Sequence, residues 1–508
     1  MSKEILFTLA HDPTYDTTST IGRLEGLQKK GFERYYNPGF LEEYINQTRC
    51  HGEDNFSFTW HPYNAPGQWM SNNISRPSKV ITDPITLERT REELESERFE
   101  YLVISTHLSG YSTFREIAKH VREEYPKVKI IAASTGALID ESSQLADFTL
   151  RGSQVHDLRS IVDQPRNDPL KITTVQSDTE TYYRGITKTG NYALLISSLG
   201  CINGCDFCPS TAQFGKEYIT PFSAQEIKDS IISAHEKIAP KSNEFIVSVA
   251  EPQGLGNIKL WKEVLRLCRN LPFKCDLVTT TSSKIIEKYG LDELTMGDLS
   301  LSTVNIGVES LLQGYKKNAG VDLKALNQRL QAAGINVVLT YIIGLDWQTK
   351  DNIREEVKLL KDIGSSAYIV ANLKMHPNTP LYKAYRKSGR LIDVPPELLN
   401  FYGYQSYVHP NFVAGFNDML PLLGEIANEL TDEGESFRTN LQIFMKRKNE
   451  KDLQKISTIK QMTENYRKSL DPRTYKENTS VIVDKFAAEL YFHLIFRQMD
   501  LFHPFVIL

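Results

Sequence analysis

The sequence predicts an α/β protein with an N-terminal doubly wound Rossmann-like domain, a central partial (βα)6 TIM-type barrel and a helical C-terminal domain. Two series of short apolar runs alternate with segments of helical periodicity, a pattern typical of parallel strands joined by crossover helices. The length of 508 residues fits about three domains. Apolar residues make up 40% of the chain and charged residues 24%, so a sizeable core can form.

The first series predicts the Rossmann-like domain over residues 1–165. Strands are expected at Ile5–Ala10, 101–104 and 128–133. Apolar residues at helical spacing between the last two predict a helix over Thr113–Tyr125. Ligands of such a sheet are expected beyond the carboxyl ends of its strands.

Two polar stretches are predicted to lack regular structure. The segment Cys50–Thr86 is rich in Asn, Pro, Ser and Trp, which indicates a loop. Residues 166–188 are predicted to be a linker between the first two domains.

The second series predicts the barrel over residues 189–395. Its six strands are expected at Tyr192–Ser197, Phe245–Val249, Leu277–Thr281, Val304–Val308, Val337–Ile343 and Tyr368–Leu373. Helices are expected between them, for example at Ala224–Ile238, Leu260–Arg269 and Leu323–Ala333. Barrels of this type place their chemistry at the carboxyl ends of the strands. Residues 396–508 form the predicted helical domain, with helices at Met419–Leu430 and Val481–Met499.

Charge and hydropathy predict a cytoplasmic protein. The net charge of −4 argues against a surface that coats nucleic acid, because phosphate binding needs concentrated Lys and Arg. The N-terminal sequence MSKEILFTLAHDPTYD lacks the long apolar stretch of a secretory signal. The sequence has no run of about 18 or more apolar residues, so no membrane span is expected.

Three of the six cysteines crowd into one short segment, Leu199-Gly-Cys-Ile-Asn-Gly-Cys-Asp-Phe-Cys-Pro-Ser. Cys201, Cys205 and Cys208 have the spacing Cys-x3-Cys-x2-Cys and follow a predicted strand. Thiolates are the ligands of iron–sulfur clusters, and three of them leave one iron of a four-iron cluster open. Gly200 and Gly204 allow the backbone to fold tightly there. The segment therefore predicts a [4Fe–4S] site that can chelate a small molecule.

A zinc site is another possible use of the clustered cysteines. A structural zinc site needs four ligands, and no fourth Cys or His follows at short range. Cys50, Cys268 and Cys275 lack a clustered pattern and are predicted to be free thiols, with Cys268 in an apolar helix.

The motif Cys-x3-Cys-x-aromatic-Cys after the first barrel strand resembles the radical S-adenosylmethionine (SAM) superfamily. The resemblance covers about 191–390 and extends to three further segments: Asn305–Ser310, Gly334–Gly344 and His376–Tyr382. The last is similar to a segment of the subgroup that carries an N-terminal cobalamin-type domain. This resemblance implies a reaction in which the cluster cleaves SAM to a 5′-deoxyadenosyl radical.

The resemblance also implies SAM contacts. Glu309 would meet the ribose and Glu251 the amino group, while Phe207 and Ile342 would flank the adenine. Ser283 is a further candidate. Two departures are present: Leu345-Asp-Trp-Gln-Thr349 replaces the family's Pro-Gly-Glu-Thr pattern, and the run 281–283 replaces a third-strand arginine.

Residues Phe99–Val162 resemble the second half of a cobalamin-binding domain, which implies cobalamin at the strand ends. Ser105, His107, Ser134 and Gly136 are the candidate contacts. The motif that supplies an axial histidine is absent. Ala133-Ser-Thr-Gly136 stands where the subgroup has Gly-Gly-Pro-His.

The predicted function is a cobalamin-dependent radical SAM methyltransferase acting on an unactivated carbon. The alternative is a radical SAM enzyme that catalyses cyclisation, rearrangement or ring contraction without methyl transfer. A tRNA methylthiotransferase needs an N-terminal cysteine trio, whereas only Cys50 precedes Cys201. A zinc-stabilised module without catalysis is the rival from another class. Expected partners are a small-molecule or peptide substrate and an electron donor such as flavodoxin or ferredoxin.

Overall fold

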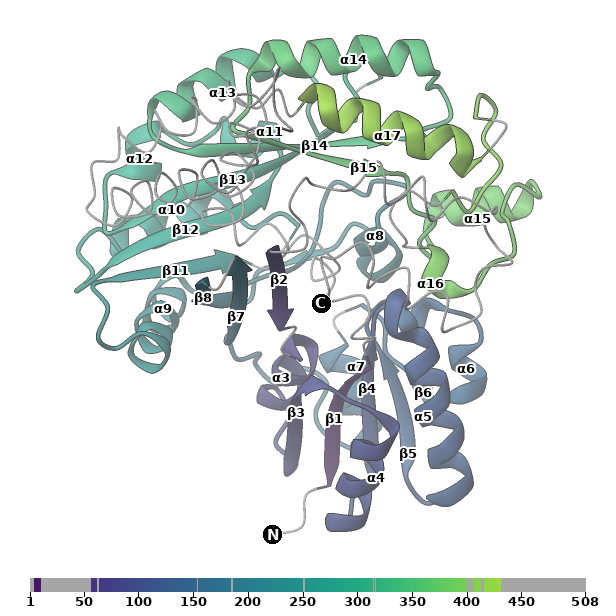
Figure 1. Ribbon diagram of the computed structural model, residues 1–508. Helices are drawn as coiled ribbons and strands as arrows, with labels where there is room; N and C mark the ends of the chain where they lie inside the picture. Colours follow the sequence, from purple (N-terminus) through teal and green to yellow (C-terminus); the bar gives the residue numbers. More distant parts are fainter. Residues whose placement is uncertain are drawn as a thin grey trace.

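The computed structural model describes residues 4–10, 56–61, 64–152, 154–183, 186–249, 252–313, 315, 317–399, 405–412 and 415–430. They form two large sheets, one in the N-terminal part and a bigger one after it (Figure 1). The loops between these sheets carry most of the predicted site residues.

The N-terminal sheet has five strands in the order β3-β1-β4-β5-β6, and all neighbours are parallel. Its strands are β1 (Ile5–Ala10), β3 (Ser78–Pro84), β4 (Tyr101–Thr106), β5 (Lys129–Ala133) and β6 (Phe148–Thr149). From β1 the chain continues to β3 on one side of β1 and then returns to place β4 on the other side. The carboxyl ends of β1 and β4 therefore mark the switch point, where doubly wound sheets bind ligands.

Alternation along each strand gives this sheet two buried faces. In β1, Ile5 and Phe7 join one apolar cluster whereas Leu6 joins another. Helices cover both faces (Figure 1). The helical segments are α3 (Ala65–Asn72), α4 (Leu87–Ser96), η4 (Leu108–Gly110), α5 (Tyr111–Glu124), η5 (Thr135–Leu138), α6 (Ser142–Leu145) and α7 (Val155–Ile161). The predicted strands and the helix α5 are confirmed, because both follow from hydrophobic periodicity.

The predicted loop Cys50–Thr86 is wrong over much of its length. It contains β2 (Phe56–His61), α3 and β3. Helix α3 starts at an N-cap, Asn64, whose Oδ1 accepts a hydrogen bond from the N–H of Gly67 at 2.9 Å. β3 is an edge strand and is only partly buried, so its sequence lacks the apolar run that revealed the central strands.

The second sheet has eight strands in the order β15-β14-β13-β12-β11-β8-β7-β2. Six of them are parallel: β8 (Ile186–Ile196), β11 (Glu244–Val249), β12 (Lys274–Thr281), β13 (Leu299–Glu309), β14 (Asn336–Ile343) and β15 (Ala367–Asn372). They match the six predicted barrel strands. Figure 1 shows them as a curved sheet with helices on its outer side.

The predicted linker over 166–188 is wrong, because it contains β7 (Thr173–Tyr183). β7 pairs antiparallel along the full length of β8, and β2 pairs antiparallel with β7. The polar composition of this hairpin concealed its strands. The second sheet thus begins before residue 189 and takes β2 from a much earlier part of the chain.

The helices of the second sheet agree closely with the periodicity. They are α8 (Pro209–Phe214), α9 (Ala224–Ile238), α10 (Ile258–Leu267), α11 (Ser283–Ile286), α12 (Leu291–Thr295), α13 (Leu323–Ala332), α14 (Lys350–Ile363) and α15 (Pro380–Lys387). A capping box of Ser223 and Glu226 starts α9 at the predicted residue. A small antiparallel pair, β9 (Leu199–Gly200) and β10 (Tyr218–Ile219), flanks the cysteine segment.

Two helices follow residue 395 among the described residues, α16 (Pro396–Leu399) and α17 (Phe416–Leu430). The predicted helix Met419–Leu430 is therefore confirmed as part of α17. Met419, Leu422 and Ile426 join the core of the second sheet, and α17 lies beside α14 (Figure 1). The boundary at residue 396 hence does not separate α17 from the barrel. The predicted helix Val481–Met499 lies outside the described residues. Within the part of the chain described, no helix is both long and apolar enough to cross a membrane.

Candidate active site

The cysteine segment follows β8 at the carboxyl edge of the parallel sheet. Gly200 has φ +81°, and a side chain there would collide with the carbonyl oxygen of Glu217. Gly204 has φ +60°. Both glycines therefore adopt left-handed conformations that other residues rarely take, which confirms that they allow the tight fold of this loop.

The three thiols lie in a shielded environment. Cys201 is buried, and Cys205 and Cys208 are partly buried. Burial raises the pKa of Cys205 to about 12. Burial also raises the pKa of Cys201 and of Cys208, and backbone N–H groups oppose the shift in both. Such thiols need a positive partner, for instance a metal, to be deprotonated.

Backbone N–H donors surround two of the sulfurs. Asn203 and Gly204 donate toward Cys201, and Ser210 and Thr211 toward Cys208. Hydrogen bonds to sulfur are one of the means by which proteins stabilise iron–sulfur clusters. Among the described residues, no three Cys, His, Asp or Glu side chains converge as a single metal ion would require.

Gln253 ties the cysteine loop to the rest of the rim. Its Oε1 accepts a 2.7 Å hydrogen bond from Asn203 Nδ2 and lies 3.9 Å from the Cys201 sulfur. Its Nε2 donates to the hydroxyls of Thr281, the last residue of β12, and of Ser282, which follows it. The sequence offered no motif for this residue, although it lies two positions after Glu251. Glu251 itself lies outside the described residues.

Glu309 ends β13 in an unusual backbone conformation, with φ +65°. Its carboxylate forms a buried ion pair with Lys317. Gly307 lies directly beside the pair, because a side chain there would touch the Glu309 carboxylate and the Lys317 ammonium. Lys317 was not predicted as a site residue, and no sequence motif would have identified it.

A loop after β13 packs on the cysteine segment. The ring of Tyr315 meets Phe207 edge to face at 5.2 Å between centroids, and its hydroxyl lies 3.5 Å from Asp206 Oδ1. Asn318 Nδ2 donates to the carbonyl of Gly307 at 2.8 Å and to that of Val308 at 3.2 Å. The loop therefore holds Lys317 between β13 and the cysteines.

Ser283 occupies a structural position. Its side chain is fully buried, and its hydroxyl donates to Asn318 Oδ1 at 2.8 Å. With its proton engaged in this bond, the Ser283 hydroxyl can still accept a hydrogen bond from a ligand.

The two residues expected to flank adenine lie in one apolar cluster. Ile342, buried at the end of β14, belongs to the cluster, and Phe207 packs against it. Leu108 of the N-terminal domain joins the same cluster, as does Met375 after β15. The structure thus brings the predicted adenine residues together at the border of the two sheets.

The segment that departs from the family pattern has a defined role. Gln348 Oε1 accepts hydrogen bonds from the N–H groups of Gly344 and Leu345 at 2.8 and 2.9 Å. Its Nε2 donates to Glu356, which is fully buried. Glu356 also accepts from the N–H groups of Leu311 and Leu312. The loops after β13 and β14 are therefore fixed by one buried network.

The candidate cobalamin residues gather at the carboxyl ends of β4 and β5. Ser105 and His107 are buried at and just after the end of β4. Ser134 and Gly136 are buried after β5, which neighbours β4. A side chain at Gly136 would collide with Thr106, so glycine allows this close approach.

Ser134 has φ +62° and ψ −155°, a region of backbone space that is essentially reserved for glycine. The subgroup has glycine at this point. The backbone shape that glycine would favour is thus present, although the residue is serine.

These strand-end loops contact the cysteine side of the barrel directly. Gln213 of α8, five positions after Cys208, donates to the carbonyl of Ser134 at 3.1 Å. Gln154 Oε1 accepts from the N–H of Ser134 at 3.2 Å. On the barrel rim, Asn378 donates to the carbonyl of Leu138 at 2.5 Å. The carboxyl ends of the two sheets therefore face one another.

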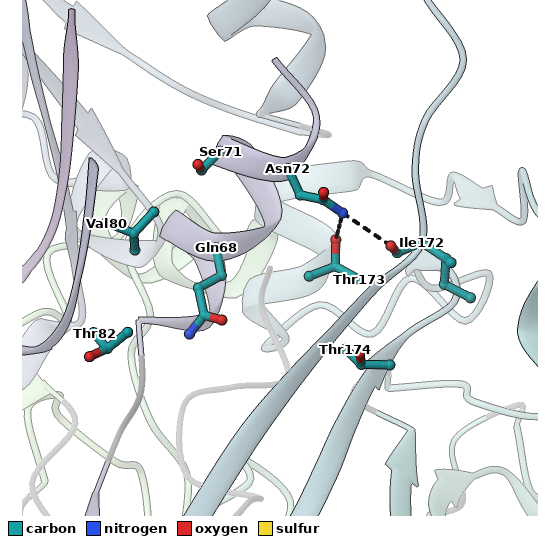
Figure 2. A pocket seen from close by; sticks show the side chains of 8 residues that line it. All are labelled: Gln68, Ser71, Asn72, Val80, Thr82, Ile172, Thr173 and Thr174. Atoms are coloured by element: carbon teal, nitrogen blue, oxygen red, sulfur yellow. Dashed lines mark hydrogen bonds between the residues drawn. The ribbon is translucent and has the colours of Figure 1, made fainter. Parts of the chain in front are cut away.

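A separate cavity of about 530 Å³ lies between α3, β3 and the start of β7 (Figure 2). It is lined by Gln68, Ser71, Asn72, Val80, Thr82, Ile172, Thr173 and Thr174. Asn72 bridges its wall by donating to the Ile172 carbonyl and the Thr173 hydroxyl (Figure 2). No charged or sulfur-bearing side chain lines this cavity, so it has none of the chemistry of the cysteine loop.

No protein-family model matches the chain. Among curated proteins, it is 23% identical over 265 residues to tRNA-2-methylthio-N(6)-dimethylallyladenosine synthase of Shewanella baltica, covering 49% of this chain and 55% of that protein. It is 24% identical over 207 residues to bacteriochlorophyllide d C-8(2)-methyltransferase of Chlorobaculum tepidum, covering 37% and 44%. The chain spans about half the length of the curated relatives it matches.

The fold is similar to that of TsrM, a radical S-adenosylmethionine methyltransferase from Kitasatospora setae solved with tryptophan substrate and a SAM analogue. The TM-score is 0.55 at 11% identity, and the match covers 85% of this chain and 91% of that one. TsrM has also been solved with cobalamin and a [4Fe–4S] cluster bound. The chain therefore has the fold of a radical SAM methyltransferase, and it is similar to the radical SAM enzymes in both its cysteine motif and its sequence.

Proposed function

We propose that the chain is a radical SAM enzyme whose Cys201, Cys205 and Cys208 hold a [4Fe–4S] cluster. The observation that carries the proposal is the cysteine loop itself: three shielded thiols at the carboxyl edge of a parallel sheet, with N–H donors aimed at two of them. When bound, the cluster and SAM together supply a 5′-deoxyadenosyl radical that abstracts hydrogen from substrate.

The residues of this chain bind and orient the cofactors. Gln253 fixes the loop that carries Cys201 through its bond to Asn203. In this proposal the Glu309 carboxylate accepts hydrogen bonds from ribose hydroxyls, and Phe207 and Ile342, which share one apolar cluster, form a wall for the adenine. Such a wall excludes water, which protects a reactive radical from side reactions.

We further propose that the N-terminal sheet binds cobalamin and that the reaction is methyl transfer to an unactivated carbon. We call the region where the carboxyl ends of the two sheets face one another the seam. Four buried polar atoms there have no hydrogen-bond partner among the described residues: Ser105 Oγ, Ser134 Oγ, Gln154 Nε2 and Gln213 Oε1. Each unsatisfied buried group costs about 1–3 kcal/mol, so a cluster of them is expected where a ligand supplies the partners. Ser105 lies at the end of β4, one of the two strands that border the switch point of the sheet.

Removal of single cluster cysteines tests the first proposal. Anaerobically reconstituted wild-type protein should hold about four iron and four sulfide per chain. Cys201→Ala, Cys205→Ala and Cys208→Ala should each lose most of the cluster and its visible absorption. Cys268→Ala is the matched control, since Cys268 is a buried thiol in the core behind the sheet. Retention of the chromophore in the three variants, or zinc alone in wild type, would overturn the proposal.

Cobalamin and methyl transfer are tested separately. Absorption spectra with added hydroxocobalamin should show a bound corrinoid that survives gel filtration. SAM turnover should yield S-adenosylhomocysteine together with 5′-deoxyadenosine. A cyclisation or rearrangement enzyme would yield 5′-deoxyadenosine without S-adenosylhomocysteine, which would reject methyl transfer and leave the cluster assignment intact.

A further inference from the structure

A buried lysine lies beside the cysteine loop without belonging to the cysteine motif. The side chain of Lys317 is only 12% exposed and that of its ion-pair partner Glu309 is 7% exposed. A buried charge is costly unless it is paired, and a lysine with its flexible stem is a costly side chain to order. The stability of the loop alone therefore does not explain why a lysine is buried at this position.

The charge of Lys317 reaches the cysteine sulfurs. Burial raises the pKa of Cys205, and the ammonium of Lys317 opposes this shift more strongly than any other group. The geometry agrees, because Tyr315, two positions before Lys317, packs edge to face on Phe207, the neighbour of Cys208 in the sequence. The ammonium of Lys317 therefore lies beside the cysteine loop.

Two contacts of Tyr315 hold the loop that carries Lys317 against the cysteine loop. Tyr315 packs on Phe207 and approaches Asp206, both of which lie between Cys205 and Cys208. On the other side of Lys317, Asn318 is bonded to β13 and to Ser283. Contacts of Tyr315 and Asn318, which flank Lys317 in the sequence, therefore fix its position. Gly307 has no side chain and so leaves space for the ammonium.

We infer that Lys317 is a built-in counter-ion of the cluster, which raises the reduction potential of the cluster and so favours its one-electron reduction. The inference rests on the proposed cluster site. Reduction adds one negative charge to the cluster, and a nearby cation in a medium of low dielectric stabilises the reduced form. Lys317 is a positioning residue in this respect, because it acts through the cluster and not on the substrate.

The test is a measurement of the midpoint potential of the cluster. Full-length, reconstituted protein is titrated with dithionite, and electron paramagnetic resonance monitors the reduced cluster. Lys317→Met should shift the potential to a more negative value, and Lys317→Gln should do the same while keeping a hydrogen bond to Glu309. Lys317→Arg should restore the wild-type potential. The control is Lys324→Met, which removes an exposed lysine paired with Asp362 and should leave the potential unchanged.

A double variant separates the two charges of the pair. Lys317→Met with Glu309→Gln should have a potential above that of Lys317→Met alone, because the carboxylate left unpaired in the single variant disfavours the added negative charge of the reduced cluster. Equal potentials in wild type and both neutral Lys317 variants would overturn the inference.

The iron and sulfide content of each Lys317 variant shows whether it still holds the cluster. If both neutral variants lose the cluster while Lys317→Arg retains it, the counter-ion is required for assembly, which supports the inference. If Lys317→Arg loses the cluster as well, the side chain serves packing and the inference fails. A wild-type protein without cluster would instead reject the proposed function itself.

Discussion

Two residues of the site have backbone conformations that their residue types rarely adopt. Glu309 has φ +65° and Ser134 has φ +62°. Such conformations cost about 1–3 kcal/mol each and persist only where the surroundings enforce them. Both lie at carboxyl ends of strands, one in each sheet, where α/β proteins bind their ligands. Strain at these two points marks the same region that the cysteine motif identifies.

His376 is a third residue whose environment is unusual. It lies after β15, beside Met375 of the cluster shared by the two sheets. Its Nδ1 is shielded from solvent and has no hydrogen-bond partner among the described residues. Burial, with a smaller contribution from Lys374, lowers the pKa of His376 from 6.5 to about 4.

This shift predicts a loss of stability in mild acid. Between pH 6.5 and 4 the unfolded chain binds a proton at His376 that the folded chain does not, so the free energy of unfolding falls as the pH falls through this range. The loss should reach about 2 kcal/mol by pH 5. Urea unfolding at pH 7.5 and pH 5 should show a smaller difference for His376→Gln than for wild type. An equal difference in both proteins would contradict the prediction.

At the scale of elements, the loops after β13 and β14 depend on a helix that lies behind them. Glu356 of α14 is fully buried and accepts hydrogen bonds from two N–H groups of the β13 loop, from the hydroxyls of Ser310 and Tyr341, and from Gln348. One carboxylate thereby fixes the exit of β13, where Glu309 is held. The rim geometry is set by packing from the outer layer as well as by the strands.

Replacement of this carboxylate should loosen the rim. Glu356→Gln turns one acceptor oxygen into a donor that faces other donors, so the protein should lose about 3 kcal/mol of stability. The unfolding midpoint in urea measures the change. Glu355→Gln, on the exposed side of the same helix, should change it by less than about 0.5 kcal/mol. Similar midpoints for the two variants would show that the network adds little.

At the scale of the whole molecule, the two sheets meet through the loops at their carboxyl ends (Figure 1). Hydrogen bonds from Gln213 and Asn378 cross the seam. Glu397 of α16 adds a third contact, because its Oε1 accepts from the N–H of Ser112 at the start of α5 at 2.8 Å. A carboxylate at this position interacts favourably with the positive end of the helix dipole.

Loss of the Glu397 contact should weaken the docking of the sheets. Glu397→Ala removes the cap of α5 at a cost of about 1 kcal/mol. Hydrogen exchange in the first turn of α5 and in η4 should become faster, whereas exchange in β12, inside the second sheet, should stay the same. Glu397→Gln keeps an acceptor and should show a smaller effect. An exposed control, Glu236→Ala, should leave both regions unchanged.

The sequence by itself determined the features that depend on local pattern. Hydrophobic periodicity marked all six parallel strands of the barrel and the helices α5, α9, α10 and α13, because a strand buried on both faces and an amphipathic helix each leave a signature within a few residues. The cysteine loop was equally visible, since its three thiols lie within eight positions of one another.

Only the tertiary structure decided the contacts between distant segments. It added the polar strand β7 and the edge strand β3, and it packed α17 onto the barrel core. It paired Lys317 with Glu309, tied Gln253 to the cysteine loop and gathered unsatisfied polar atoms at the seam. The physical reason is the same in each case: a polar side chain gives no periodic signal, and its partner is chosen by the packing of elements far apart in the chain.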